Sequence, residues 1–189
     1  MGFAIAAAAA RRGHSVTLIA GPVGLATPDG VHRRDVVSAV EMLDVGREVL
    51  AAERCATLVG VAAVSDFRPA ERLPGKPAKH AARHRIDLVE NPDVLGSLAA
   101  LGVARLAVGF ALEHLGTSGP AFDAAVERAR GKLDRKKLHA IVLNGVPTME
   151  AAEVEAWWIT EDAVVALAGP ASKAAVAEQL VLRIEASFR

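Results

Sequence analysis

The feature that most constrains the fold is a series of short, almost continuously apolar runs along the chain. The runs read ATLVGVAAV, RIDLVE, ARLAVGF and HAIVLN, at residues 56–64, 85–90, 104–110 and 139–144. Strands of a parallel sheet have such sequences because helices cover both of their faces. Helical patterns lie between the runs, and alternating strands and helices are typical of α/β proteins. The sequence therefore predicts a doubly wound, mostly parallel, Rossmann-like sheet.

The opening run MGFAIAAAAA is predicted to be the first helix, because alanine is the best helix former. Gly13 is expected to end that helix. A bilayer-spanning helix needs about 20 apolar residues, which excludes a membrane anchor here. Arg11 and Arg12 follow the apolar run, whereas a secretory signal has its positive charge in front. We therefore expect neither export nor membrane attachment.

The remaining patterns complete a single predicted domain over residues 1–189. Ser38 and Glu41 have the spacing of a capping box, at the start of a helix expected at 38–53. A turn at Glu161 and Asp162 separates two apolar runs and predicts a β-hairpin, which an amphipathic closing helix follows. The adjacent Trp157 and Trp158 should face opposite sides of their strand. The other expected elements are strands at 15–20 and 31–36 and helices that start near 91 and span 120–135.

Composition excludes several classes of protein. The 22 Lys and Arg residues balance 22 Asp and Glu residues, so net charge gives no general attraction to nucleic acid or anionic membranes. Cys55 is the single cysteine, which excludes an internal disulfide and a zinc site of several thiolates. A buried, inert thiol and a reducing, cytoplasmic location are the expectations.

Residues 65–84, SDFRPAERLPGKPAKHAARH, interrupt the regular alternation of strands and helices. A polar, basic and proline-containing loop of this length is usually a lid or a disordered segment, so we expect a mobile loop that can close over an anion. His80 and His84 in it are interpreted as solvated side chains rather than metal ligands. Asp66 follows an apolar strand, where open α/β sheets bind ligands. A turn or capping role for Asp66 is an equally good interpretation from position alone.

The chain lacks the glycine motifs of common nucleotide-binding loops. Gly75-Lys76 and Gly131-Lys132 have neither the earlier glycine nor the following Ser or Thr of a phosphate loop. A nicotinamide-dependent reductase would need a glycine fingerprint, and Gly21-Pro22 is unlike one. A reductase is therefore the least favoured of the functions considered.

An ordered series of segments resembles a known family. MGFAIAAAAARRG, AAVSDFRPA, GKPAK, VENPDVL, VGFALE and KLDRKKLHAIVLN are similar to the phosphopantothenoylcysteine synthetase domain of the bacterial bifunctional coenzyme A biosynthesis flavoprotein. The segments cover almost the whole chain in the family's order. The resemblance implies CTP-dependent ligation of 4′-phosphopantothenate and L-cysteine through an acyl-cytidylate. It also implies Mg²⁺, a homodimer and a possible upstream flavin-dependent decarboxylase domain.

The same resemblance assigns site residues by their place in the motifs. Lys76 and Lys79 of the basic loop correspond to the catalytic lysine motif, with Lys76 favoured for stabilising the intermediate or the departing phosphate. The metal ligands stay unknown. The residues implied to bind nucleotide are Ala62, Ala63, Asp66, Lys76, Pro92, Asp93, Val94, Leu95, Phe110, Lys132 and Lys136.

Some family features have no counterpart in this sequence. The family's first strand, glycine-rich turn and catalytic asparagine are not matched, so we expect an N-terminally truncated domain whose sheet lacks a central strand. Two functions stay open as a result, an active ligase and a nucleotide-binding remnant with impaired catalysis. The chain also departs from the usual family residues at Glu90, His114, His139 and Gly145.

Overall fold

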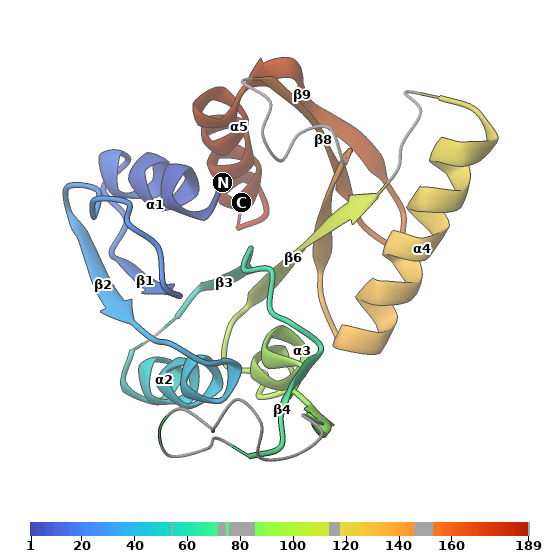
Figure 1. Ribbon diagram of the computed structural model, residues 1–189. Helices are drawn as coiled ribbons and strands as arrows, with labels where there is room; N and C mark the ends of the chain where they lie inside the picture. The colour runs from blue at the N-terminus through green and yellow to red at the C-terminus, as the bar shows by residue number, and fades with distance from the viewer. Residues whose placement is uncertain (54, 72–74, 76–85, 114–117, 146–152, 189) are drawn as a thin grey trace.

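The computed structural model describes residues 1–53, 55–71, 75, 86–113, 118–145 and 153–188 (Figure 1). Within them the chain forms helices and strands in an alternating order that confirms the predicted α/β class. The elements in chain order are α1 Gly2–Arg11, β1 Val16–Ala20, β2 Val31–Asp35, α2 Ala39–Ala52, β3 Thr57–Gly60, β4 Phe67–Pro69, β5 Leu88–Glu90, α3 Val94–Ala99, β6 Leu106–Glu113, α4 Pro120–Lys136, β7 Ala140–Gly145, β8 Glu153–Ile159, β9 Val164–Ser172 and α5 Lys173–Ala186.

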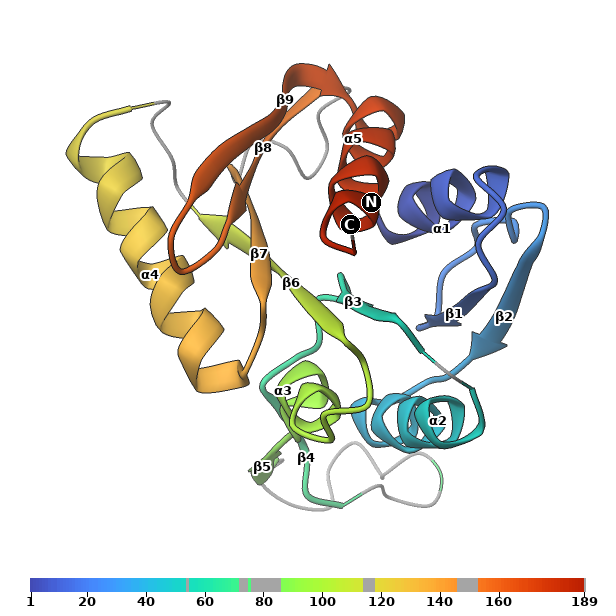
Figure 2. The ribbon, with the colours of Figure 1, turned by 180° about the vertical axis from the view of Figure 1, so that it is seen from behind.

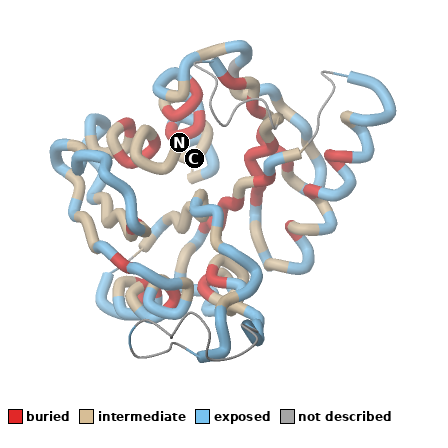
Figure 3. Tube along the Cα trace, viewed as in Figure 1, coloured by how far each residue is buried: buried red, intermediate tan, exposed pale blue. Residues whose placement is uncertain are grey.

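The main sheet has the strand order β3-β6-β7-β8-β9, parallel from β3 to β7 and antiparallel from β7 to β9. Helices cover both faces (Figures 1 and 2). On β7, Ala140 and Val142 belong to a core that includes α1 and α5. Ile141 and Leu143, on the opposite face, pack with α4. Figure 3 shows the buried segments concentrated along the middle of this sheet, which explains why these strands are apolar at every position.

Several local predictions are confirmed. α1 is followed by Gly13, whose φ of +84° is a conformation that glycine adopts without strain. At the start of α2, Ser38 Oγ accepts a hydrogen bond from the Glu41 N–H at 3.2 Å. Trp158 is buried in the main core, and Trp157 lies on the other face against Phe122. Across the described residues, no helix combines the length and hydropathy needed to cross a bilayer.

The interpretation of RIDLVE as a parallel core strand was wrong. Its residues 88–90 form β5, which pairs antiparallel with β4 in a separate two-stranded ribbon. Ile86 is 72% exposed and Leu88 is 59% exposed, so these apolar side chains do not enter the core. The start of the predicted 65–84 loop also contains a strand, β4 at Phe67–Pro69. Most of that loop, residues 72–74 and 76–85, lies outside the described residues.

β1 and β2 form a second parallel sheet that is not hydrogen-bonded to the main one. β1 lies between α1 and α2, yet among the described strands its neighbour is β2 alone. β3, at the edge of the main sheet, likewise pairs with β6 alone among them. The expected sheet is therefore divided between β1 and β3.

α1 and α5 are joined by charged side chains at one end of their contact. Arg12 donates two hydrogen bonds to the Glu185 carboxylate, at 2.8 and 2.6 Å, and His14 lies 2.8 Å from the same group. Arg11 pairs with Glu178 on the preceding turns of α5. The bonds from Arg12 and then His14 lower the pKa of Glu185 to about 2.

This pair predicts how stability depends on pH. A carboxyl whose pKa falls on folding stabilises the protein above its unfolded value of 4.5, and loses that contribution as the pH drops toward 2. Glu185→Gln should lower the melting temperature at pH 7, and the difference from the unmodified protein should shrink as the pH approaches 2. Thermal unfolding across this range measures both, with Glu161→Gln at an exposed bend as the control. An unchanged difference at low pH would contradict the assignment.

Candidate functional site

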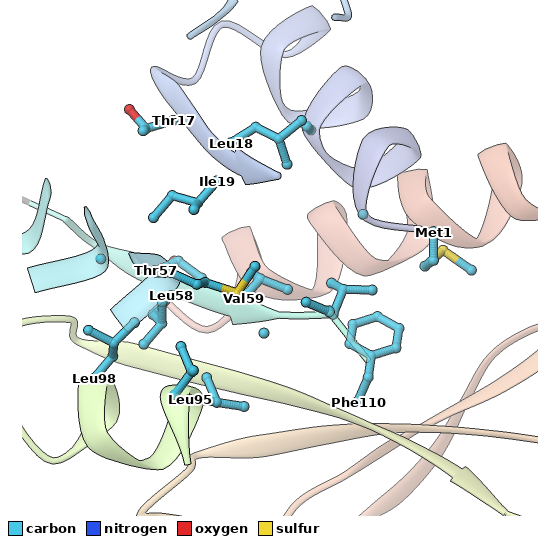
Figure 4. A pocket seen from close by; sticks show the side chains of 18 of the residues that line it. Met1, Thr17, Leu18, Ile19, Thr57, Leu58, Val59, Leu95, Leu98 and Phe110 are labelled. Atoms are coloured by element: carbon cyan, nitrogen blue, oxygen red, sulfur yellow. The ribbon is translucent and has the colours of Figure 1, made fainter. Parts of the chain in front are cut away.

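A cavity of about 1800 Å³ runs from the gap between β1 and β3 to the carboxyl ends of the parallel strands. Figure 4 shows side chains of β1 and β3 around it, together with Met1 and Phe110. Ligands of open α/β sheets bind at the carboxyl ends of strands, which makes this end of the cavity the candidate site.

Most of the predicted nucleotide-binding residues meet at this end. Lys132 does not line the cavity but lies on the same helix as Lys136. The predicted catalytic residues Lys76 and Lys79 lie outside the described residues. The predicted residues that line the cavity are Ala62, Ala63, Asp66, Pro92, Asp93, Val94, Leu95, Phe110 and Lys136.

The segment after β3 is held against the turn before α3 by Asn91. The Asn91 backbone N–H donates to the Asp66 carbonyl at 2.7 Å, and its side-chain amide donates to the Ser65 carbonyl at 2.8 Å. Arg68 donates to Asn91 Oδ1 at 3.2 Å. The two predicted segments 62–66 and 92–95 are therefore fixed side by side. Sequence reasoning missed Asn91, although its place before Pro92 marked the turn.

Asp93 caps α3, where the resemblance implies a nucleotide-binding turn. Its Oδ1 accepts the Gly96 N–H at 3.1 Å, so the protein's own carboxylate already occupies part of the helix N-terminus. The Val94 side chain is buried. A Cβ on Gly60 would come within 2.6 Å of the Leu95 side chain, so the missing side chain lets Leu95 pack against β3. Val94 and Leu95 thus hold the turn on the sheet.

Cations of α4 pair with carboxylates at the site. Lys136 Nζ lies 2.8 Å from Asp93, and Lys132 Nζ lies 2.8 Å from Glu113, the last residue of β6. Arg128 lies 3.1 Å from the same Glu113. The three cations are spaced by four residues and therefore share one face of α4. Sequence reasoning missed Glu113, because its pairing with α4 is a tertiary contact.

These ion pairs keep both carboxylates charged. Burial raises the pKa of Asp93, but the hydrogen bonds from Lys136 and the Gly96 N–H outweigh it and leave that pKa below its usual value. Burial likewise raises the pKa of Glu113, and the bonds from Lys132 and Arg128 reverse the shift. A bound polyphosphate would therefore have to compete with these carboxylates for the lysines.

Two more side chains define the wall of the cavity. Phe110 of β6 is partly buried and, like Met1, packs against the core that includes α1 and α5. Asn144, on the neighbouring β7, lines the cavity and has a buried Oδ1 that finds no hydrogen-bond partner among the described residues. A buried acceptor is costly to leave unpaired, so a ligand with an N–H or O–H group can stabilise it. The position of Asn144 at a strand's carboxyl end was the signal for it.

The described residues contain no group of three His, Cys, Asp or Glu side chains placed to bind a metal ion. Mg²⁺ is commonly held by one or two carboxylates together with substrate phosphates, so it does not need such a group. Asp66 is exposed at the cavity wall, and no described cation pairs with its carboxylate. Cys55 is half-buried rather than buried as predicted, it lines the other end of the cavity, and burial raises the pKa of its thiol.

The dual role of Asp93 can be separated by two substitutions. Asp93→Ala removes both the cap and the Lys136 partner and should destabilise the protein by about 1 kcal/mol or slightly more. Asp93→Asn keeps the cap and should destabilise the protein by only about a few tenths of a kcal/mol, as expected for an exposed ion pair. Urea unfolding with matched slopes measures both. Equal destabilisation by the two substitutions would contradict the capping role.

Comparison with known proteins fits this arrangement. The family model of the DNA/pantothenate metabolism flavoprotein C-terminal domain matches residues 1–188. The coenzyme A biosynthesis bifunctional protein CoaBC of Mycolicibacterium smegmatis is 37% identical over 199 residues, which span 100% of this chain and 47% of that protein. Its Escherichia coli counterpart is 43% identical over 150 residues, which span 77% of this chain and 34% of that protein.

A solved structure supports the same assignment. The crystal structure of the C-terminal domain of a CoaBC protein matches with a TM-score of 0.77 and 28% identity, over 99% of this chain and 81% of that one. The chain spans about a third to a half of the length of its curated relatives. The match over residues 1–188 confirms the family indicated by the sequence motifs: this chain belongs to the DNA/pantothenate metabolism flavoprotein C-terminal domain family.

Proposed function

We propose that this chain catalyses the CTP-dependent ligation of 4′-phosphopantothenate and L-cysteine in coenzyme A biosynthesis. The observation that carries the proposal is the cavity end that gathers Asp66, Asp93, Phe110 and Lys136 from separate parts of the chain. These are motif residues of the family, and they meet where α/β sheets bind ligands. The relatives are named as coenzyme A biosynthesis proteins, which supports the pathway.

In the first step, a carboxylate oxygen of phosphopantothenate attacks the α-phosphorus of CTP. The bond between that phosphorus and the pyrophosphate oxygen breaks, which leaves an acyl-cytidylate and pyrophosphate. Both reactants are anionic, so cations are needed to offset their repulsion and the charge on the departing group. Lys132 and Lys136 on α4 are the described candidates, once a phosphate replaces Glu113 and Asp93 as their partner.

In the second step, the amine of cysteine attacks the acyl carbon and the bond to CMP breaks. The new amide forms as the attacking nitrogen loses a proton. Lys76, and secondarily Lys79, are proposed to stabilise the intermediate or the departing phosphate. Cysteine, phosphopantothenate and CTP are thus the proposed small-molecule partners.

Mg²⁺ bound with CTP would neutralise phosphate charge during the first step. Asp66 is the described carboxylate best placed to accompany it, because it is exposed at the cavity wall. The homodimer and an upstream decarboxylase domain remain parts of the proposal. The second is supported by the bifunctional name of the relatives, of which this chain spans only part.

The reaction can be tested directly on residues 1–189. Pyrophosphate release should require both phosphopantothenate and CTP, and added cysteine should convert the acyl-cytidylate to amide and CMP. Lys76→Gln should lower the rate of pyrophosphate release at saturating CTP. Release that ignores phosphopantothenate, or an unchanged rate in the variant, would contradict the proposal. CTP binding without any release would favour the alternative of a nucleotide-binding remnant.

Lys136 at the end of α4 and the adjacent Lys137 give a matched pair of variants. Lys136→Gln should weaken CTP binding about tenfold, since a hydrogen bond to a charged group contributes about 1.5 kcal/mol. Lys137→Gln removes the same charge one residue away, at an exposed position outside the cavity, and should leave binding unchanged. Calorimetric titration with CTP compares them. Equal effects in the two variants would show that only net charge matters.

A further inference from the structure

A second, smaller cavity lies at the opposite edge of the main sheet from the candidate nucleotide site. Its volume is about 300 Å³, at the lower end of the range for small-molecule sites. Leu106 is the first residue of β6 and His139 comes directly before β7, and both line this cavity. Arg183, near the end of α5, lines it as well. The cavity is therefore at the amino ends of strands whose carboxyl ends form the candidate site.

The ring of His139 is held in one orientation and one tautomer. The His139 backbone N–H donates to the Ala107 carbonyl at 2.8 Å, and the Ala107 N–H donates to His139 Nδ1 at 2.9 Å. Because Nδ1 accepts a hydrogen bond, the ring carries its single proton on Nε2. Among the described residues, no acceptor is bonded to that Nε2–H. The ring therefore brings an unused donor to the cavity.

Arg183 brings a positive charge to the same cavity. Two carboxylates of its own helix, Glu178 and Glu185, pair with Arg11 and Arg12 instead. Within the part of the chain that the structure describes, no carboxylate forms an ion pair with the Arg183 guanidinium. A guanidinium can donate two parallel hydrogen bonds to one carboxylate group, which makes arginine well suited to bind it.

Thr160 adds a third donor, and apolar side chains complete the lining. Thr160 Oγ1 accepts the Ala163 N–H at 3.1 Å, which leaves its hydroxyl proton for another acceptor. Trp158 and Leu106 are buried and line the cavity together with these polar groups. The cavity thus combines one cation and two neutral donors with an apolar wall.

We propose that this cavity is a second binding site, which takes a small organic carboxylate with an apolar body. The carboxylate accepts hydrogen bonds from the Arg183 guanidinium, the His139 Nε2–H and the Thr160 hydroxyl. The apolar body packs against Trp158 and Leu106. One guanidinium balances a single negative charge, whereas a triphosphate needs several cations. CTP is therefore not the ligand of this cavity, and the inference does not depend on the proposed reaction.

Benzoate and benzamide are matched probes, because they share a ring and differ in charge. Each is titrated into the isotopically labelled full chain at constant ionic strength, and the amide and indole NMR signals are followed. Benzoate should cause saturable shifts at Leu106, His139 and the Trp158 indole. Trp157, on the opposite face of the sheet, is the internal control. Benzamide should bind at least about tenfold more weakly, because it lacks the charge that Arg183 pairs with.

Three variants test the assigned donors. Arg183→Gln should weaken benzoate binding about tenfold. Arg130 Nε lies 3.5 Å from the Thr160 carbonyl oxygen but does not line the cavity, so Arg130→Gln should change the affinity by less than about twofold. His139→Asn keeps a δ-position acceptor for the Ala107 N–H and lacks the Nε2–H, so it should weaken binding with little change in melting temperature. Equal binding of benzoate and benzamide, or unchanged affinity in Arg183→Gln, would overturn the proposal.

Two competitors separate this site from other anion sites. Inorganic phosphate at the same ionic strength should displace benzoate only weakly, because it gains nothing from the apolar wall. CTP should leave benzoate bound. Displacement by CTP, or phosphate binding as tight as that of benzoate, would overturn the assignment to organic carboxylates. Benzoate-induced shifts centred on the larger cavity would overturn the location of the site.

Discussion

The structure depends on the burial of β6 between two strands and two layers of helices. β6 is hydrogen-bonded to β3 on one side and to β7 on the other, and Val108 at its centre is fully buried. Its side chains pack into the α1 and α5 core on one face of the sheet and into the α4 core on the other face. The carboxyl ends of β3, β6 and β7 are thereby brought to one edge. The candidate site is formed by the loops and side chains at that edge.

The sequence was most informative where burial and periodicity agree. The runs that became β6 and β7 are apolar on both faces because both faces are covered, so their pattern identified them. The run that forms β5 was wrongly predicted to be a core strand, because Leu88 and Val89 are apolar yet exposed in a ribbon with β4. The apolar composition of a run does not show whether its strand packs in the core or lies at the surface. The division of the sheet between β1 and β3 depends on pairing between distant segments. The local pattern does not predict it, and the expectation of a sheet without a central strand came from the family resemblance.

The sequence predicted only part of the candidate site, again because it does not report contacts between distant segments. The motifs identified Asp66, Asp93 and Lys136, and the structure brings them to one cavity. The motifs did not predict that Lys136 and Lys132 are held by Asp93 and Glu113, since these contacts join elements far apart in the sequence. In the unliganded site, each of these two lysines is therefore paired with a carboxylate of opposite charge. The lysines are kept in place by carboxylates that, under the proposed function, a polyphosphate would have to displace.

The proposed function requires that the carboxyl edge of the main sheet bind a nucleoside triphosphate. Titration of the isotopically labelled protein with CTP, followed through its amide NMR signals, tests it most directly. We expect shifts concentrated at residues 62–66, 92–95 and 110, and near Lys132 and Lys136. The second, smaller cavity, which His139 and Arg183 help to line, should remain unaffected. Shifts centred on that cavity, with the carboxyl edge unperturbed, would show that the nucleotide binds elsewhere.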